Sequence, residues 1–357
     1  MNSRVIVVAN QWLPFCRQLG LELPIVQAPM AGVQGSALAI AVSSAGGLGS
    51  LPCALITHAT LRDELSAITA ATTKPYNVNF FCHKPPAADA DRESRWRQRL
   101  APYYRELGID PAAIPSGGGR APFDDRAADV LSEFKPRVVS FHFGLPSPEL
   151  LERVRSWRPM ILSSATTVEE ARWLEANGAD AIIAQGIEAG GHRGMFLTDD
   201  LTTQIGTFAL LPQIIRAVRV PVIAAGGIAD ADGVAAALRL GAAAVQIGTS
   251  YLLCPEATTG PTHRAALTSN AGSHTALTNV FTGRPARGIV NRAVAELGPM
   301  AGEAPAFPLA SAAMAPLRAQ AESRHSGDFS PLWSGQNTTG CREIPAADLT
   351  RELAAGI

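Results

Sequence analysis

The residue best suited to exchange a proton is His192, in the glycine-rich segment GIEAGGHRG, residues 186–194. Four glycines in this segment predict a flexible loop that is open to a pocket and is not part of the core. A pKa near neutrality lets histidine accept a proton or stabilise an anion. The alternative is a loop histidine bonded to a backbone carbonyl, but we interpret His192 as a catalytic residue.

Two further glycine-containing loops could hold a phosphate. Gly226 and Gly227 follow the apolar run VIAA and precede a helical stretch, so bare N–H groups and the helix end could face an anion. The second loop contains Gln246, Ile247, Gly248 and Thr249, where Gly248 permits close backbone approach and Thr249 offers a hydroxyl. Glycines that merely permit tight turns are the alternative, but two such loops favour a phosphate site.

Three more polar side chains lie at or near the ends of expected strands. Asn79 in NVNFF and Gln185 in IIAQG carry amides that could bond the polar edge of a ring system. His142 in SFHFG alternates with Phe141 and Phe143, so it either lines the pocket or is a satisfied interior histidine. The residues alone favour the second interpretation of His142.

These residues would be brought together by an eight-stranded barrel. Two complete βαβ units start at Pro159 and Pro221, a spacing of two βα units in a barrel of about 250 residues. Eight buried strands are expected: Ile25–Ala28, Gly47–Leu51, Tyr76–Phe81, Val138–Phe143, Met160–Ser164, Ala181–Gln185, Val222–Ala225 and Ala243–Ile247. The fold class is therefore α/β, a (β/α)8 TIM barrel. An open doubly wound sheet is the alternative, but QAPMAGV follows the first strand in place of G-x-G-x-x-G.

Two segments interrupt the barrel repeat. Residues 82–130 contain a charged helical stretch, Asp89–Leu107, and a loop, Pro115–Arg120, which we expect over the active face. Residues 256–328 mix helical stretches with Gly and Pro, which predicts a smaller inserted capping subdomain. The barrel would then comprise residues 1–255 and about 329–357, with FSPLWSGQ and a helix from Ala346 returning to it.

The composition excludes several classes of function. Thirty basic and thirty-one acidic residues give a net charge of -1, which argues against nucleic-acid and membrane partners. Five scattered cysteines without a C-x-x-C pair argue against a zinc site and a disulfide framework. No signal-peptide core or membrane span is expected, so we predict a cytoplasmic protein, with the oligomeric state open and a homodimer as one alternative.

Five of these stretches together resemble nitronate monooxygenases of the class I bacterial type, formerly called 2-nitropropane dioxygenases. They are QAPMAGV, NVNFF, SFHFG, ADAIIAQGIEAGGHRG and PVIAAGGI with AVQIGTSYL, which cover most of residues 24–252 in order. Gln34–Leu38, QGSAL, departs from the proline-containing version of the family, which concerns the shape of the substrate more than the chemistry.

The resemblance implies a function and a set of contacts. FMN would be bound, with Met30 beside the flavin and with Asn79, Gln185, Gly190, Gly227 and Gln246–Thr249 at contact positions. His192 would match the active-site histidine, which positions the nitronate oxygens and acts as a base if neutral nitroalkanes are used. Small alkyl nitronates and O2 would give a carbonyl compound and nitrite, without NAD(P)H and without a metal.

Two other enzymes remain as alternatives at this point. A flavin-dependent NADH enoyl-thioester reductase would share the barrel and a glycine-flanked histidine. A phosphosugar isomerase or lyase would use the same glycine loops for the phosphate of its substrate and would lack flavin. A barrel that binds a ligand without catalysis ranks last, because several polar groups converge on the loops.

Overall fold

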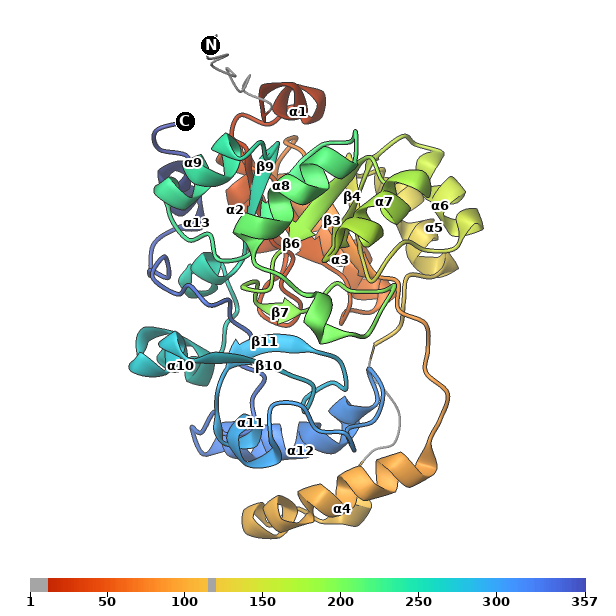
Figure 1. Ribbon diagram of the computed structural model, residues 1–357, viewed down its shortest axis with the longest axis vertical. Coiled ribbons are helices and arrows are strands. Elements are labelled where there is room, and N and C mark those ends of the chain that lie inside the picture. The colour runs from red at the N-terminus through yellow and green to blue at the C-terminus, as the bar shows by residue number, and fades with distance from the viewer. Residues whose placement is uncertain (1–11, 115–119) are drawn as a thin grey trace, which may run out of the picture.

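The eight expected strands form one parallel barrel in the computed structural model, which describes residues 12–114 and 120–357 (Figure 1). The strand order is β1-β9-β8-β6-β5-β4-β3-β2, and a parallel bridge between Val26 and Leu48 joins its two ends. Gln27 N donates to Leu48 O at 2.9 Å across this junction. The strands are β1 Ile25–Gln27, β2 Gly49–Pro52, β3 Tyr76–Phe81, β4 Val138–His142, β5 Met160–Ala165, β6 Ala181–Gln185, β8 Val222–Ala225 and β9 Ala244–Ile247. The predicted TIM barrel is thus confirmed.

Helices cover the outside of the barrel because their apolar faces pack on alternate strand residues. Ile182, Ala224 and Val245 face this helical layer, where they contact residues such as Leu210 and Leu174. The covering helices are α2 Ser36–Ser44, α3 His58–Ala71, α5 Asp125–Phe134, α6 Pro148–Arg155, α7 Val168–Ala176, α8 Thr207–Ala217, α9 Ala231–Arg239 and α13 Ala346–Leu353. The helix expected from Ala346 is therefore present.

One end of the barrel is closed by helix α1, Trp12–Leu19. Phe15 and Leu19 pack in one cluster with Val26, Leu162 and Ile183 of the barrel strands. This apolar plug lies at the amino-terminal end of the strands, so the opposite end is left for polar loops, as is general in this fold.

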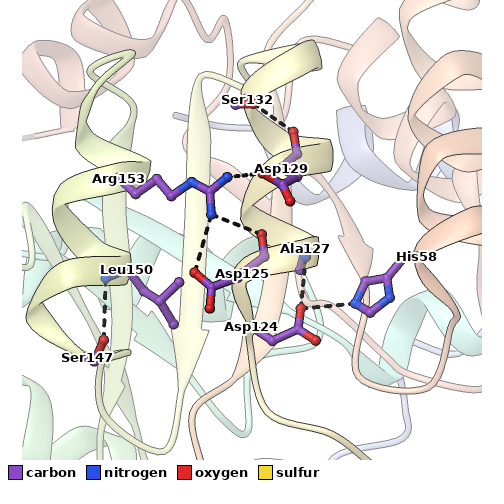
Figure 2. Close-up of polar contacts among 9 residues, drawn as sticks. All are labelled: His58, Asp124, Asp125, Ala127, Asp129, Ser132, Ser147, Leu150 and Arg153. Carbon is purple, nitrogen blue, oxygen red and sulfur yellow. Dashed lines mark hydrogen bonds and ion pairs between the residues drawn. The ribbon is translucent and has the colours of Figure 1, made fainter.

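The helical layer is also fixed by polar contacts at helix ends (Figure 2). Asp124 caps the first turn of α5 by accepting from Ala127 N at 2.8 Å, and it contacts His58 Nε2 of α3 at 3.0 Å. Arg153 of α6 reaches across to Asp125 and Asp129 of α5. Helices α3, α5 and α6 are linked in this way at the surface, where each pair contributes at most about 1 kcal/mol.

A second layer lies beyond the loop end of the barrel (Figure 1). It contains a three-stranded antiparallel sheet in the order β10-β11-β7, with β10 Thr275–Thr278, β11 Ala286–Ile289 and β7 Gly191–His192. Its helices are α10 Pro261–Thr268, α11 Arg292–Leu297 and α12 Ala310–Ser323. Because β7 belongs to the loop after β6, this sheet joins residues 275–289 directly to the barrel.

The helix of the 82–130 excursion packs against this second layer. Helix α4, Ala90–Leu107, begins after Asp89, whose side chain accepts from Arg92 N. Its buried Trp96 and Leu100 share a cluster with Phe281 and Leu317, and Tyr104 Oη donates to Ala313 O at 2.7 Å. The expected loop 115–120 lies outside the described residues except for Arg120.

Replacing Trp96 by alanine should test this packing. Loss of a fully buried indole leaves a cavity, and we expect the free energy of unfolding to fall by about 3–5 kcal/mol. The exposed neighbour Arg95, changed to alanine, is the control and should alter stability by less than about 0.5 kcal/mol. Urea unfolding followed by circular dichroism measures both, and equal stabilities of the two variants would contradict the packing.

Candidate active site

A single cavity at the carboxyl ends of the strands contains every site residue expected from the sequence. Its lining includes His192, Met30, Asn79, Gln185, Gly190, Gly226, Gly227, Gln246, Ile247, Gly248, Thr249 and His142. Residues that the sequence did not single out also line it, among them Arg120, His263, Trp333 and Asn337. The barrel topology explains this convergence, because all strand ends of a parallel barrel meet on one face.

His192 is held far more firmly than its glycine-rich surroundings suggest. The carbonyl oxygen of His192 accepts from Gln185 Nε2 at 3.0 Å and from His142 Nε2 at 3.2 Å. Gln185 Oε1 in turn accepts from Gly194 N at 2.7 Å. His192 also pairs with Ala286 in the β7–β11 ladder, and its side chain is buried. The expectation of a flexible loop was therefore wrong, because strand pairing and side-chain hydrogen bonds order the segment.

Arg193 fixes the same segment through buried hydrogen bonds. Its guanidinium is fully buried and donates to the carbonyl oxygens of Gln185 and Gly186, each at 2.7 Å. Its Nε donates to Gln204 Oε1 at 3.0 Å. These contacts satisfy a buried cation with neutral acceptors and tie the residue after His192 to the end of β6.

The tautomer of His142 follows from its two partners. A carbonyl oxygen can only accept, so His142 Nε2 carries the proton that is donated to His192 O. Nδ1 then accepts from the hydroxyl of Ser164 at 3.0 Å. Burial lowers the pKa of His142 to about 3, which keeps it neutral. Both expectations for His142 hold together: it is a satisfied histidine, and it lines the cavity.

His192 has a comparable partner in Thr282. His192 Nε2 lies 2.9 Å from Thr282 Oγ1, and the Thr282 hydroxyl donates to Arg284 O at 3.4 Å. Since that hydroxyl has one proton, its oxygen accepts from His192 Nε2–H, which leaves Nδ1 as the basic nitrogen. Burial first, then the charge of Arg120, holds the pKa of His192 well below its usual range. His192 is thus neutral at physiological pH.

Aromatic rings surround His192 on several sides. The ring centroids of Phe307 and Trp333 lie 5.2 Å and 5.5 Å from that of His192. Phe81 and Phe143 lie slightly farther away, at 6.1 Å and 6.2 Å. The histidine therefore works in a largely apolar enclosure, where interactions with charge are stronger than in water.

The glycine loops offer unpaired donors to an anion. Gly226 and Gly227 adopt φ values of +116° and +75°, which favour glycine. Within the described part of the chain, the backbone N–H groups of Gly227, Gly248 and Thr249 donate to no protein acceptor. The helix end expected to assist them is capped, because Asp230 accepts from Gly233 N before α9. We refer to the unpaired N–H groups of Gly227, Gly248 and Thr249 as the cradle.

Unpaired side-chain atoms accompany the cradle. Gln246 Oε1 is buried and has no hydrogen-bond partner among residues 12–114 and 120–357. Asn79 uses its Nδ2 on Ser140, at 2.9 Å from the hydroxyl, which leaves its Oδ1 for a ligand. The cavity therefore suits a ligand with an anionic end and polar ring edges.

Comparisons with known proteins identify the family. A family profile described as nitronate monooxygenase matches residues 15–356. The chain belongs to the nitronate monooxygenase family. It is an oxidoreductase, and membership of this family implies a flavin cofactor. The nitronate monooxygenase of Paraburkholderia phytofirmans is 43% identical over 94% of this chain and 92% of its own length. The nitronate monooxygenase of Pseudomonas aeruginosa is 42% identical over 95% and 97%.

A solved structure supports the same assignment. The crystal structure of nitroalkane oxidase from Streptomyces ansochromogenes superposes with a TM-score of 0.87. The two sequences are 40% identical, and the match covers 95% of this chain and 96% of that one. The barrel and the second layer are thus shared over nearly the whole chain. No helix in the described part of the chain is long and apolar enough to cross a membrane.

The residues that the sequence did not single out come from outside the barrel strands. His263 lies in α10, and Trp333 and Asn337 lie in the segment that returns to the barrel. Arg120 lies in the excursion after β3. Thr282 meets His192 across ninety residues of sequence. No motif or strand periodicity in their local sequence marks them as site residues.

Acid should destabilise the folded chain because four histidines are buried in neutral form. Burial lowers the pKa of His83 and His263 to about 4, of His142 to about 3, and that of His192 well below the ordinary value. The unfolded chain takes up protons below a pH of about 6.5, so stability is lost as pH falls through 6.5. Each histidine contributes up to about 1.4 kcal/mol per pH unit.

Urea unfolding at pH 7.5 and at pH 5 measures this effect. Most carboxylates remain ionised above pH 5, so this window isolates the histidines. A free energy of unfolding that is the same at both pH values would contradict the neutral, buried state of the four side chains.

Proposed function

We propose that this chain binds FMN and oxidises small alkyl nitronates, such as propionate 3-nitronate, with O2 to a carbonyl compound and nitrite without NAD(P)H. The observation that carries the proposal is a cavity with a donor-rich cradle, neutral histidines and no carboxylate among its described lining residues. Such a cavity favours anions, and both an FMN phosphate and a nitronate are anions.

The cofactor would be held by groups already directed into the cavity. The N–H groups of Gly227, Gly248 and Thr249 would bind the phosphate, with Gly226 permitting the turn. Gln185, Gln246 and Asn79 would bond the polar edge of the ring system. Met30, Gly190 and Ile247 would lie along the ring. When bound, the flavin supplies the electron-accepting chemistry that no side chain in the cavity provides.

His192 would act at the other reactant. Its unprotonated Nδ1 would remove the α-proton of a neutral nitroalkane, whereas a nitronate has already lost that proton. Thr282 would hold the proton on Nε2 and so keep Nδ1 basic. Phe81, Phe307 and Trp333 would exclude water from the reacting carbon.

The subdomain of residues 256–328 would cap this site. It contributes His263 to the cavity wall, Thr282 to the histidine and Phe307 to the aromatic enclosure. The barrel itself, residues 1–255 and about 329–357, would hold the cofactor. Substrate selection would therefore depend mainly on residues 256–328.

Oxygen uptake and nitrite release on addition of ethylnitronate, without NADH, test the proposal. We expect both, from a protein whose visible spectrum shows flavin and whose released cofactor is FMN. His192→Asn should keep the flavin yet lose most activity with neutral nitroethane. A yellow protein that consumes NADH and leaves nitronates untouched would support an enoyl-thioester reductase, and unchanged rates for the variant would refute the role of His192.

Thr282→Val should separate positioning from folding. Loss of the hydroxyl removes the acceptor of His192 Nε2–H, and we expect kcat/KM with nitroethane to fall by about tenfold. The rate with ethylnitronate should change much less, because no proton is removed. Thr278→Val, at the buried threonine that ends β10, is the matched control. Equal losses with both substrates would indicate a merely structural role for Thr282.

A further inference from the structure

Arg120 is a cation in the cavity that has no counter-charge. Among the lining residues in the described part of the chain, it is the one charged side chain other than the histidines. Its Nε and Nη1 are buried and have no hydrogen-bond partner there. Burial, and after it the charge of Arg318, lowers the pKa of Arg120 to about 10, so the group is a cation at neutral pH.

A buried guanidinium with two unused donors is costly unless an anion meets it. Arg193 illustrates the contrast, because all three of its nitrogens are satisfied by Gln185 O, Gly186 O and Gln204 Oε1. Arg120 therefore does not have the partners of a structural arginine. The partner that its chemistry requires is a small anion with two acceptor atoms.

The position of Arg120 separates it from the phosphate cradle. Its guanidinium lies over the ring of Phe307, with the carbon 5.6 Å from the ring centroid. The same ring lies 5.2 Å from His192 and 5.5 Å from Phe143, between centroids. The cradle follows β8 and β9, whereas Phe143 follows β4, and β5 and β6 lie between these strands in the sheet. Arg120 thus belongs to the reacting side of the cavity.

We propose that Arg120 binds the planar, negatively charged head of the nitronate and so selects the anionic reactant over the neutral nitroalkane. This inference rests on the proposed function and adds to it a specificity-determining residue. His192 cannot serve as this donor in the tautomer that Thr282 imposes, because its one N–H is directed to the Thr282 hydroxyl. The two residues then divide the work: Arg120 holds the nitronate oxygens, and His192 accepts the α-proton when one is present.

Nitrate is the probe for this site because it is planar, carries one negative charge and resembles the nitronate head. Its binding to the purified protein with bound cofactor is measured by calorimetry and by the change in the visible flavin spectrum. In Arg120→Gln we expect nitrate to bind at least about tenfold more weakly, and KM for ethylnitronate to rise by a similar factor. The KM for neutral nitroethane should change much less.

Two further variants make the test specific. Arg120→Lys keeps the charge without the planar pair of donors, so its nitrate affinity should lie between those of the wild type and Arg120→Gln. Arg318→Gln removes a nearby surface charge that does not line the cavity, and it should bind nitrate as the wild type does. Unchanged nitrate affinity and nitronate KM in Arg120→Gln would overturn the proposal.

These experiments distinguish failure of the Arg120 site from failure of the proposed function. A wild-type protein that binds nitrate through Arg120 but oxidises no nitronate would refute the proposed function and retain an anion site at Arg120. A wild-type protein that oxidises nitronates with the same KM in Arg120→Gln would retain the function and refute the site.

Discussion

The anchoring of residues 191–194 to the end of β6 is the constraint on which the site depends. The side chain of Gln185 accepts from Gly194 N and donates to His192 O. The guanidinium of Arg193 donates to the carbonyl oxygens of residues 185 and 186. Without these bonds a segment with glycines at 190, 191 and 194 would sample many conformations. With them, the imidazole of His192 is fixed relative to both the strand ends and the sheet of the second layer.

The charges of the cavity wall are the second feature that shapes the site. The cavity wall has histidines held neutral by burial and a single arginine, and no carboxylate faces it from the described residues. Arg120 therefore provides the positive charge of this wall, and the same charge helps to keep His192 unprotonated. The enclosure by Phe81, Phe307 and Trp333 strengthens these interactions by removing water.

Much of this arrangement could be predicted from local sequence. All eight barrel strands were found because strands buried on both faces form continuous apolar runs, although β2 begins at Gly49 instead of Gly47. Helix α4 was visible in its charged pattern after the capping Asp89. The twelve expected site residues meet in one cavity because each lies at or just beyond a strand end, a place that the barrel itself defines.

What local sequence could not supply were partners from distant segments. The order of the His192 loop depends on Ala286, and its tautomer depends on Thr282, both far along the chain. Arg120 and His263 lie in segments that the sequence placed over the active face or in the capping subdomain, but these segments lack strand periodicity, so nothing marked the two residues themselves as lining the cavity. The sequence analysis expected the amino-terminal end of α9 to face an anion. The carboxylate of Asp230 instead accepts from Gly233 N and caps this helix end.

We propose that a flavin held in this cavity would accept electrons directly from a nitronate. Addition of ethylnitronate to the purified protein in the absence of oxygen, followed by visible spectroscopy, tests this most directly. We predict that the nitronate alone changes the flavin absorbance and that NADH alone does not. A flavin spectrum that responds to NADH and is indifferent to the nitronate would contradict it.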